Sequence, residues 1–322
     1  MRFTLLRMAK PILSLEAAVR ETRFPATYRP RLLVTCSDVP ASYIDPLRNK
    51  CDVTVCEGVD RDEILQGVPG AGGILWLTAD RLDGGSAGAG WAAAAGGFDD
   101  DVVNNPVADI AVGLMLAAAR RFHEGRVAIL EERWEQRPQW MLGQDVAGAT
   151  VGIVGFGGIG QTIAKRLRGF DVGRLIYTGH GEKVEAKEFG ASFVGFDELL
   201  RKSDFVFVVC PLTSETKNLF NAEAFKKMKP TSVLVNVARG GIVDQPALIE
   251  ALRNGTIFAA GLDVMTPEPL PPNDPLMTLP NCIVVPHLGT ATRQSLEDMF
   301  CITARNVLSV LAGGTLVAPF KK

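Results

Sequence analysis

The sequence predicts an α/β protein in which a doubly wound parallel sheet is inserted into a smaller domain. Three observations predict this fold. A glycine fingerprint follows a short apolar segment in the middle of the chain, short apolar segments alternate with amphipathic stretches around it, and a Gly/Ala-rich stretch interrupts this alternation at 84–97. Buried parallel strands are almost continuously apolar, and the helices that connect them have one apolar face. The 322 residues suffice for about two domains.

Residues 1–29 differ in composition from the rest of the chain. They carry six basic side chains against Glu16 and Glu21, with apolar side chains between them. A basic, amphipathic N-terminus is typical of a transit peptide, whereas the two glutamates are not, because transit peptides contain few acids. We therefore expect either a leader, which would direct the chain to mitochondria, or a disordered extension, which a misassigned start codon would also produce. Without a leader, we expect a cytoplasmic protein.

The predicted substrate domain comprises residues 30–104 and 290–322. Expected strands at 31–37, 52–57 and 72–78 alternate with expected helices at 42–50 and 61–68, which is a flavodoxin-like pattern. Within 84–97, twelve of fourteen residues are Gly or Ala, a composition that cannot bury a specific core. A complete flavodoxin-like sheet would need two more strands, each reached by a crossover connection of a dozen or more residues. Only 29 residues separate Trp76 from Pro106, and two such units do not fit into that length. We therefore expect either a truncated domain, in which the Gly/Ala-rich stretch replaces regular elements, or a spliced or mispredicted version of an intact one.

A long apolar helix is predicted to follow, over 106–121. Asn105 would be its N-cap and Pro106 its first residue, after a solvated acidic run at 99–101. Because this stretch is apolar almost all round, the helix would be buried either between domains or against another subunit.

A Rossmann-type dinucleotide-binding domain is predicted over 105–289, and its fingerprint is TVGIVGFGGIG at 150–160. Gly155 permits a tight turn, Gly157 lets the backbone approach a pyrophosphate, and Gly160 lets helix and strand pack closely. An ordinary strand-to-helix turn can show the same glycines, so the elements that follow decide between the two interpretations. The expected strands are at 174–178, 204–210, 231–237, 257–264 and 281–286, and the expected helices are at 182–190, 196–203, 222–229 and 244–255. Repeated alternation of this kind indicates a doubly wound domain.

Composition disfavours several classes of protein. The net charge of −2 provides no basic field for nucleic acid or acidic membranes. No apolar run approaches the roughly 18 residues that span a bilayer. The six cysteines form no CxxC pair, which indicates reduced core residues of an intracellular protein. We expect a small-molecule ligand, without nucleic acid, membrane or metal.

Three polar residues follow consecutive expected strands at the carboxyl edge, where open α/β sheets bind ligands. They are Arg239, Glu268 and His287. Histidine is the natural proton donor near neutral pH, a neighbouring carboxylate favours its charged form, and an arginine fork suits a substrate carboxylate. Taken singly, each has a purely structural interpretation: Arg239 as a surface turn residue, Glu268 as a solvated loop acid and His287 as a structural histidine. Together they favour a catalytic group.

At these residues the chain resembles the D-2-hydroxyacid dehydrogenase family, most closely its glyoxylate/hydroxypyruvate reductase branch. The stretches that carry the resemblance are VGIVGFGGIGQTIAKRL, KMKPTSVLVNVARGGIVDQPALIEAL, AAGLDVMTPEPLPPNDPL and NCIVVPHLGTAT. The resemblance implies that His287 is the proton donor, Glu268 its partner and Arg239 the group that orients a 2-keto acid. It also implies a homodimer, with 106–126 at the interface and Trp140 reaching the partner's active site to contact substrate. The resemblance also places seven residues around the cofactor or the site, namely Gly157, Gly158, Ile159, Pro211, Val237, Asp263 and Gly289. We expect further cofactor contacts from Gly155 and Gly160 of the glycine fingerprint, and from Gly179 and His180 after the second strand.

The choice of cofactor depends on the end of the second strand. An NAD site needs an acid about 20 residues beyond the glycines to hold the ribose hydroxyls, and this chain has Tyr177, Thr178, Gly179 and His180 there. A 2′-phosphate would not be repelled, and His180 with Lys183 could attract it, although the reductase relatives usually have an arginine in place of His180. We therefore expect NADPH, with NAD possible, and reduction of glyoxylate or hydroxypyruvate. The short 77–105 segment leaves a second hypothesis, a catalytically impaired nucleotide-binding scaffold that is also dimeric.

Overall fold

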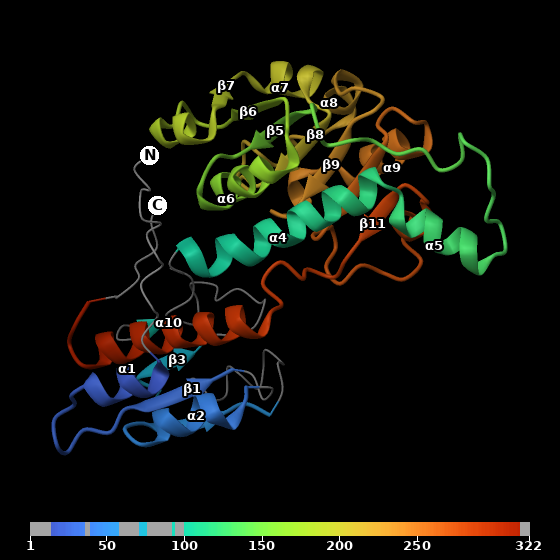
Figure 1. The fold of residues 1–322 in the computed structure, drawn as a ribbon. Coiled ribbons are helices and arrows are strands. Elements are labelled where there is room, and N and C mark those ends of the chain that lie inside the picture. Colours follow the sequence, from blue (N-terminus) through green and yellow to red (C-terminus); the bar gives the residue numbers. More distant parts are fainter. Residues whose placement is uncertain (1–13, 36–38, 58–70, 76–91, 94–99, 316–322) are drawn as a thin grey trace. The chain divides into compact units, whose positions relative to one another are not determined.

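The computed structural model describes residues 14–35, 39–57, 71–75, 92–93 and 100–315 (Figure 1). The chain divides into two compact units. The first unit comprises Met1–Val102 with Thr292–Lys322, and the second unit comprises Val103–Ala291. The junctions expected from the sequence between these two parts were 104/105 and 289/290.

The second unit contains a seven-stranded parallel sheet of order β11-β10-β9-β8-β5-β6-β7. Its strands are β5 Thr150–Val154, β6 Arg174–Thr178, β7 Ala191–Phe193, β8 Phe205–Val208, β9 Val233–Asn236, β10 Ala259–Leu262 and β11 Cys282–Val284. The expected strands correspond to six of these, and β7 was not expected. The strand order reverses between β5 and β8, which creates the switch point where doubly wound sheets bind ligands.

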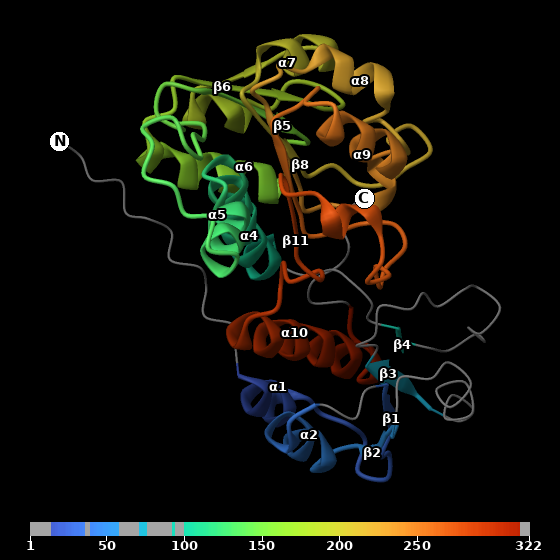
Figure 2. The same ribbon diagram turned by 90° about the vertical axis from the view of Figure 1, so that its right-hand side faces the viewer.

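Helices cover both faces of this sheet (Figure 2). One face is packed by α4 Asp100–Ala119 and α6 Gly158–Leu167, and the other by α7 Phe196–Lys202, α8 Ala222–Lys227 and α9 Gln245–Arg253. Shorter 3-10 segments are η1 Arg168–Phe170, η2 Val184–Phe189, η3 Gly240–Ile242 and η4 Pro275–Thr278. The predicted α-helix at 182–190 is therefore wrong in type, since η2 is a 3-10 segment that ends at Gly190 with a φ of 63°.

Helix α4 differs from its prediction in two respects. It begins at Asp100, so Asn105 is not its N-cap and Pro106 lies inside the helix. Its apolar side packs into the core of its own unit, where Ala108, Ala111 and Met115 are fully buried, so this burial requires no second subunit. The window Val102–Ala119 is also long and apolar enough to cross a membrane by length and composition, contrary to expectation, but more than half of it is buried in this fold.

The first unit contains a parallel sheet of order β2-β1-β3-β4. Its strands are β1 Arg31–Val34, β2 Asp52–Val55, β3 Gly73–Leu75 and β4 Ala92–Ala93, and its helices are α1 Leu15–Glu21, α2 Ala41–Arg48 and α10 Arg293–Leu311. The order is that of a flavodoxin-like sheet. Strand β4 lies within the Gly/Ala-rich stretch, for which no regular element was expected. The rest of that stretch and the expected helix at 61–68 lie outside the described residues.

Helix α1 shows that residues 15–21, which lie within the stretch expected to be a leader or a disordered extension, form a regular element. The Ser14 hydroxyl caps the helix by accepting a hydrogen bond from the Ala17 N–H. Leu15 and Val19 are buried in the same core as Leu32 and Val307. The apolar residues at 15–19 therefore form one side of a packed helix in the first unit.

Candidate active site and cofactor cavity

The glycine loop between β5 and α6 has the geometry of a phosphate-binding turn. Gly155 adopts a φ of 99°, and a Cβ there would lie 2.8 Å from the backbone nitrogen of Cys210. A Cβ at Gly160 would lie 2.4 Å from the Gly155 carbonyl oxygen, so α6 packs directly on the turn. A Cβ at Gly157 would meet no atom within 4 Å. No protein atom therefore fills the space beside Gly157. This space lies at the N-terminus of α6, where an anion is favoured.

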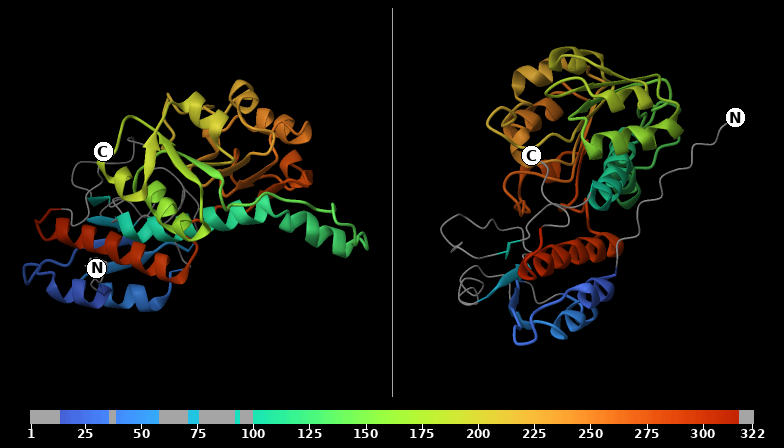
Figure 3. Two further views of the ribbon diagram at one scale, coloured as in Figure 1. Left: turned by 45° about the horizontal axis from the view of Figure 1, so that its top comes forward. Right: turned by 90° about the vertical axis from the view of Figure 1, so that its left-hand side faces the viewer.

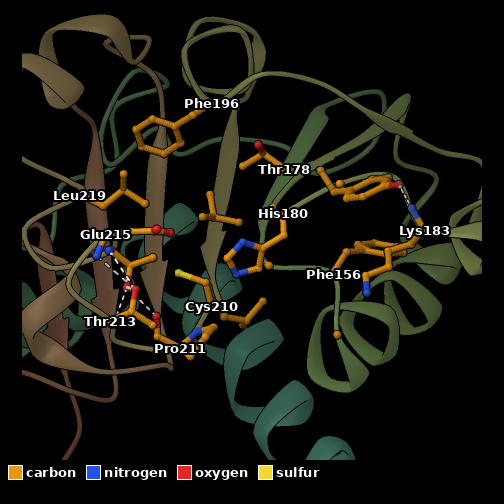
Figure 4. Close-up of a pocket in the computed structure, with 18 residues that line it drawn as sticks. Phe156, Thr178, His180, Lys183, Phe196, Cys210, Pro211, Thr213, Glu215 and Leu219 are labelled. Atoms are coloured by element: carbon orange, nitrogen blue, oxygen red, sulfur yellow. Dashed lines mark hydrogen bonds between the residues drawn. The ribbon is translucent and has the colours of Figure 1, made fainter. Parts of the chain in front are cut away.

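A cavity of about 410 Å³ opens beside this loop (Figure 4). The end of β6 and the segment after β8 form its other walls. Of the predicted cofactor residues, the cavity is lined by Gly155, Gly157, Gly179, His180 and Pro211, whereas Gly158, Ile159, Gly160, Val237, Asp263 and Gly289 are not in its lining. The open space at Gly157 and the position of the cavity at the switch point both fit a dinucleotide.

The polar groups of the cavity come from opposite walls. His180 and Lys183 follow β6, and Glu215 lies in the segment after β8, together with Thr213 and Thr216. The end of β6 itself presents no carboxylate. Cys210 also lines the cavity, and its burial raises the pKa of its thiol to about 11. In the wall after β8, Pro211 is the one residue that was expected from the sequence.

Glu268 and His287 form a hydrogen-bonded pair at the ends of neighbouring strands. Glu268 follows β10 and His287 follows β11, and 2.8 Å separates Glu268 Oε2 from His287 Nδ1. The other carboxylate oxygen of Glu268 accepts a hydrogen bond from the Met265 N–H at 3.0 Å. About half of the His287 side chain is exposed. The pair therefore fixes Nδ1 and leaves Nε2 as the ring nitrogen that can exchange a proton with a ligand.

Asp263 fixes the backbone of the segment that contains His287. Its carboxylate accepts hydrogen bonds from the Leu288 N–H at 2.6 Å and the Gly289 N–H at 2.9 Å. Its carbonyl oxygen accepts another from the His287 N–H at 2.9 Å. Burial raises the pKa of Asp263, although the two N–H groups that bond its carboxylate oppose this shift. His287 itself adopts a φ of 55°, a left-handed conformation that these bonds maintain.

Arg239 lies at the end of β9, the next strand of the sheet. It is exposed, and its Nη1 donates a hydrogen bond to the Ala238 carbonyl at 2.6 Å. Asn236 braces this turn, because its amide donates to the Arg239 carbonyl and accepts from the Ala238 N–H. In the part of the chain that the structure describes, no ion pair joins Arg239 to Glu268. The structure thus brings the acid and the histidine into contact and places the arginine on the adjacent strand end.

Two further residues connect these loops. Gly240 lies against the backbone of Met265, since a Cβ at Gly240 would be 1.9 Å from the Met265 carbonyl oxygen. Gln245 accepts a hydrogen bond from the Thr266 N–H at 3.0 Å and donates one to Asp274 at 3.1 Å, which holds both ends of the loop that carries Glu268. The glycine-rich stretch after Arg239 was visible in the sequence, but nothing in the sequence marked Gln245.

Trp140 does not join this group. It lines a separate cavity of about 410 Å³ together with Arg121, Arg137, Gln139 and Met141. Among the described residues, no cluster of three His, Cys, Asp or Glu side chains could hold a metal ion.

Comparison with known proteins agrees with this geometry. Residues 112–289 match the profile of the D-isomer specific 2-hydroxyacid dehydrogenase, NAD binding domain. The chain is 44% identical over 227 residues to the glyoxylate reductase/hydroxypyruvate reductase of Homo sapiens, which covers 70% of this chain and 69% of the relative. It is 39% identical over 316 residues to the glyoxylate reductase of Thermococcus onnurineus, covering 88% of this chain and 94% of the relative.

The solved structures show the same relationship. The TT0316 protein from Thermus thermophilus superposes with a TM-score of 0.81 at 36% identity, covering 90% of this chain and 99% of that protein. This chain belongs to the D-isomer specific 2-hydroxyacid dehydrogenase family. Its second unit contains the domain that binds the nicotinamide cofactor.

Proposed function

We propose that the protein reduces glyoxylate to glycolate, or hydroxypyruvate to D-glycerate, with NADPH as the reductant. The observation that carries this proposal is the hydrogen-bonded Glu268–His287 pair, at the carboxyl edge of the sheet that also forms the nucleotide cavity. The names of the curated relatives support the substrate class.

The proposed proton donor is His287, whose Nε2 gives a proton to the carbonyl oxygen of the keto acid. Glu268 contacts Nδ1 and orients the ring, which leaves Nε2 as the nitrogen that can face the substrate. Arg239 binds the substrate carboxylate with its planar guanidinium, which is exposed on the adjacent strand end. When bound, the nicotinamide supplies the hydride to the carbonyl carbon.

The preference for NADPH rests on the wall of the cavity that follows β6. An NAD-selective wall would have a carboxylate there, and this chain has Thr178, Gly179 and His180 instead. His180 and Lys183 both line the cavity, where both can donate hydrogen bonds to a 2′-phosphate and Lys183 adds a positive charge. Glu215 is an acid of the same cavity, but it belongs to the segment after β8.

The proposed quaternary structure is a homodimer. Helix α5, Phe122–Leu130, extends away from the sheet of the second unit (Figure 3). On α5 and the segment after it, five large apolar side chains are mostly exposed, namely Phe122, Ile129, Leu130, Trp134 and Leu142. Such a surface is suited to a second copy of the chain. Sedimentation equilibrium tests whether the protein is a homodimer. We expect a dimeric wild type and a monomeric I129D/L130D variant, and a monomeric wild type would refute the proposal.

Steady-state oxidation of NADPH with glyoxylate and hydroxypyruvate tests the activity. We expect turnover by the wild type, a loss on the order of 10²- to 10⁴-fold in kcat for H287A, and little change for H123A. His123 is an exposed histidine on α5, outside the cofactor cavity and outside the Glu268–His287 pair. If the wild type binds NADPH without turning over either acid, the reductase proposal is refuted and the non-catalytic scaffold remains.

A further inference from the structure

Tyr177 lines the cofactor cavity, and its hydroxyl bonds to protein backbone. Tyr177 is almost fully buried, and its Oη accepts a hydrogen bond from the Lys183 N–H at 2.7 Å. Figure 4 shows this bond as the dashed line to Lys183. Lys183 is the residue before η2, so its N–H is not used within that segment. The hydroxyl therefore ties the start of η2 to the end of β6.

The hydrogen bond closes a short loop whose central residue is His180. Gly179 and Gly181 flank His180, and both line the cavity. An added Cβ at either glycine would meet nothing within 4 Å, so the neighbouring protein does not pack against either α-carbon on that side. Glycine loses more conformational freedom on ordering than any other residue. The Tyr177–Lys183 bond is the described contact that opposes this freedom.

The ring of Tyr177 connects the same loop to the phosphate-binding turn. It stacks on Phe156 with ring centroids 4.4 Å apart and 30° between the planes. Phe156 lies between Gly155 and Gly157, and its carbonyl accepts a hydrogen bond from the Gln161 side chain of α6. One buried side chain thus contacts both segments that would bind phosphate groups.

We propose that Tyr177 is a positioning residue for NADPH selectivity, because its hydroxyl fixes the loop Gly179–Lys183 so that His180 and Lys183 meet the 2′-phosphate. The proposal rests on the proposed use of NADPH. Without the hydroxyl, binding of NADPH must order a loop that contains two glycines. NADH has no 2′-phosphate and gains nothing from that ordering. Tyr177 should therefore affect the two nucleotides differently.

The test compares Y177F with the wild type by titrating NADPH and NADH against protein fluorescence, without keto acid. Y177F keeps the stacked ring and removes only the hydroxyl. A lost hydrogen bond of this kind corresponds to a rise of roughly 3- to 10-fold in the Kd for NADPH. We expect the Kd for NADH to change by less than about 2-fold, because NADH has no 2′-phosphate for His180 and Lys183 of the anchored loop to meet.

Two controls separate positioning from general damage. Y43F removes the hydroxyl of Tyr43, which stacks on Phe300 in the first unit, and should leave both Kd values unchanged. In the H180A/K183A background, Y177F should cause no further loss of NADPH affinity, since residues that act through one another are not additive. An equal rise of both Kd values, or none, in Y177F would overturn the inference. A wild type that does not favour NADPH over NADH would instead refute the cofactor proposal itself.

Discussion

Replacing Gly240 with alanine tests how the arginine loop and the acid loop are held together. Gly240 is buried immediately after Arg239, and its α-carbon lies against the backbone of Met265. Met265 in turn donates its N–H to Glu268, the partner of His287. A methyl group at position 240 therefore acts at the point where both catalytic loops meet.

The size of the perturbation follows from the distances. The new Cβ would lie 1.9 Å from the Met265 carbonyl oxygen and 2.1 Å from the carbonyl carbon, whereas ordinary contact begins at 3.4 Å. The two backbones must separate by about 1.5 Å, because no side chain can move aside instead. Overpacking of this kind costs about 1–3 kcal/mol of stability. A misplacement of about 1 Å at a catalytic group costs on the order of 100-fold in rate.

The assay measures kcat/KM for glyoxylate, the Kd for NADPH and the free energy of unfolding in urea. We expect G240A to lose on the order of 100-fold in kcat/KM and about 1–3 kcal/mol of stability. The Kd for NADPH should stay close to that of the wild type, because neither Gly240 nor Met265 lines the cofactor cavity.

Gly241 provides a matched control in the next position. A Cβ there would lie 3.2 Å from Leu212 Cδ2, which belongs to a partly exposed side chain that can move. G241A should therefore retain nearly full activity and stability. Equal effects of G240A and G241A would refute the argument that the contact with Met265 aligns the two loops.

Three other predictions follow from the same site. E268Q keeps a hydrogen-bonding side chain beside His287 but removes its charge, so reduction should slow on the order of 100-fold in kcat; a kcat equal to that of the wild type contradicts this. Because burial raises the pKa of Cys210 from 9.0 to about 11, iodoacetamide should alkylate it at pH 8 about 100-fold more slowly than an ordinary thiol, as peptide mass spectrometry can measure. Burial also raises the pKa of Asp263 in the folded state, so ionisation of this carboxyl opposes folding. The free energy of unfolding of the wild type should therefore fall, relative to that of D263N, as the pH rises through the raised pKa of Asp263. Urea titrations from pH 3.5 to 7 measure this difference between the two proteins, and a difference that stays constant would argue against the prediction.

The elements that were correctly expected are those whose burial leaves a signal in the sequence. Strands β8 and β9 are buried at every position, so each appears as an unbroken apolar run. Strand β7 at the edge of the sheet was missed because Ser192 and Phe193 are exposed and form no such run. Helix α4 was started too late because Pro106 was taken as its first residue, whereas the helix continues on both sides of that proline.

The contacts that position the site could not be derived in the same way. Gln245 bonds to Thr266 and Asp274, and Tyr177 bonds to a backbone N–H, and no motif in the sequence marks either residue. Their partners depend on how loops pass one another in space. Glycine was the exception, since Gly160 had a stated packing role and a Cβ there would indeed lie 2.4 Å from the Gly155 carbonyl.

The strand order explains why one half of the site was easier to predict than the other. On the side of β9, β10 and β11, the order along the chain is also the order in the sheet. Consecutive strand ends are therefore neighbours, and Arg239, Glu268 and His287 could be grouped directly from the sequence. On the other side, β8 pairs with β5 although β6 and β7 intervene in the chain. The cavity wall that contains Thr213 and Glu215 faces the glycine loop only because of this crossover. Prediction from the sequence is thus strongest where the chain does not change direction across the sheet and weakest at the switch point, which is where the cofactor cavity lies.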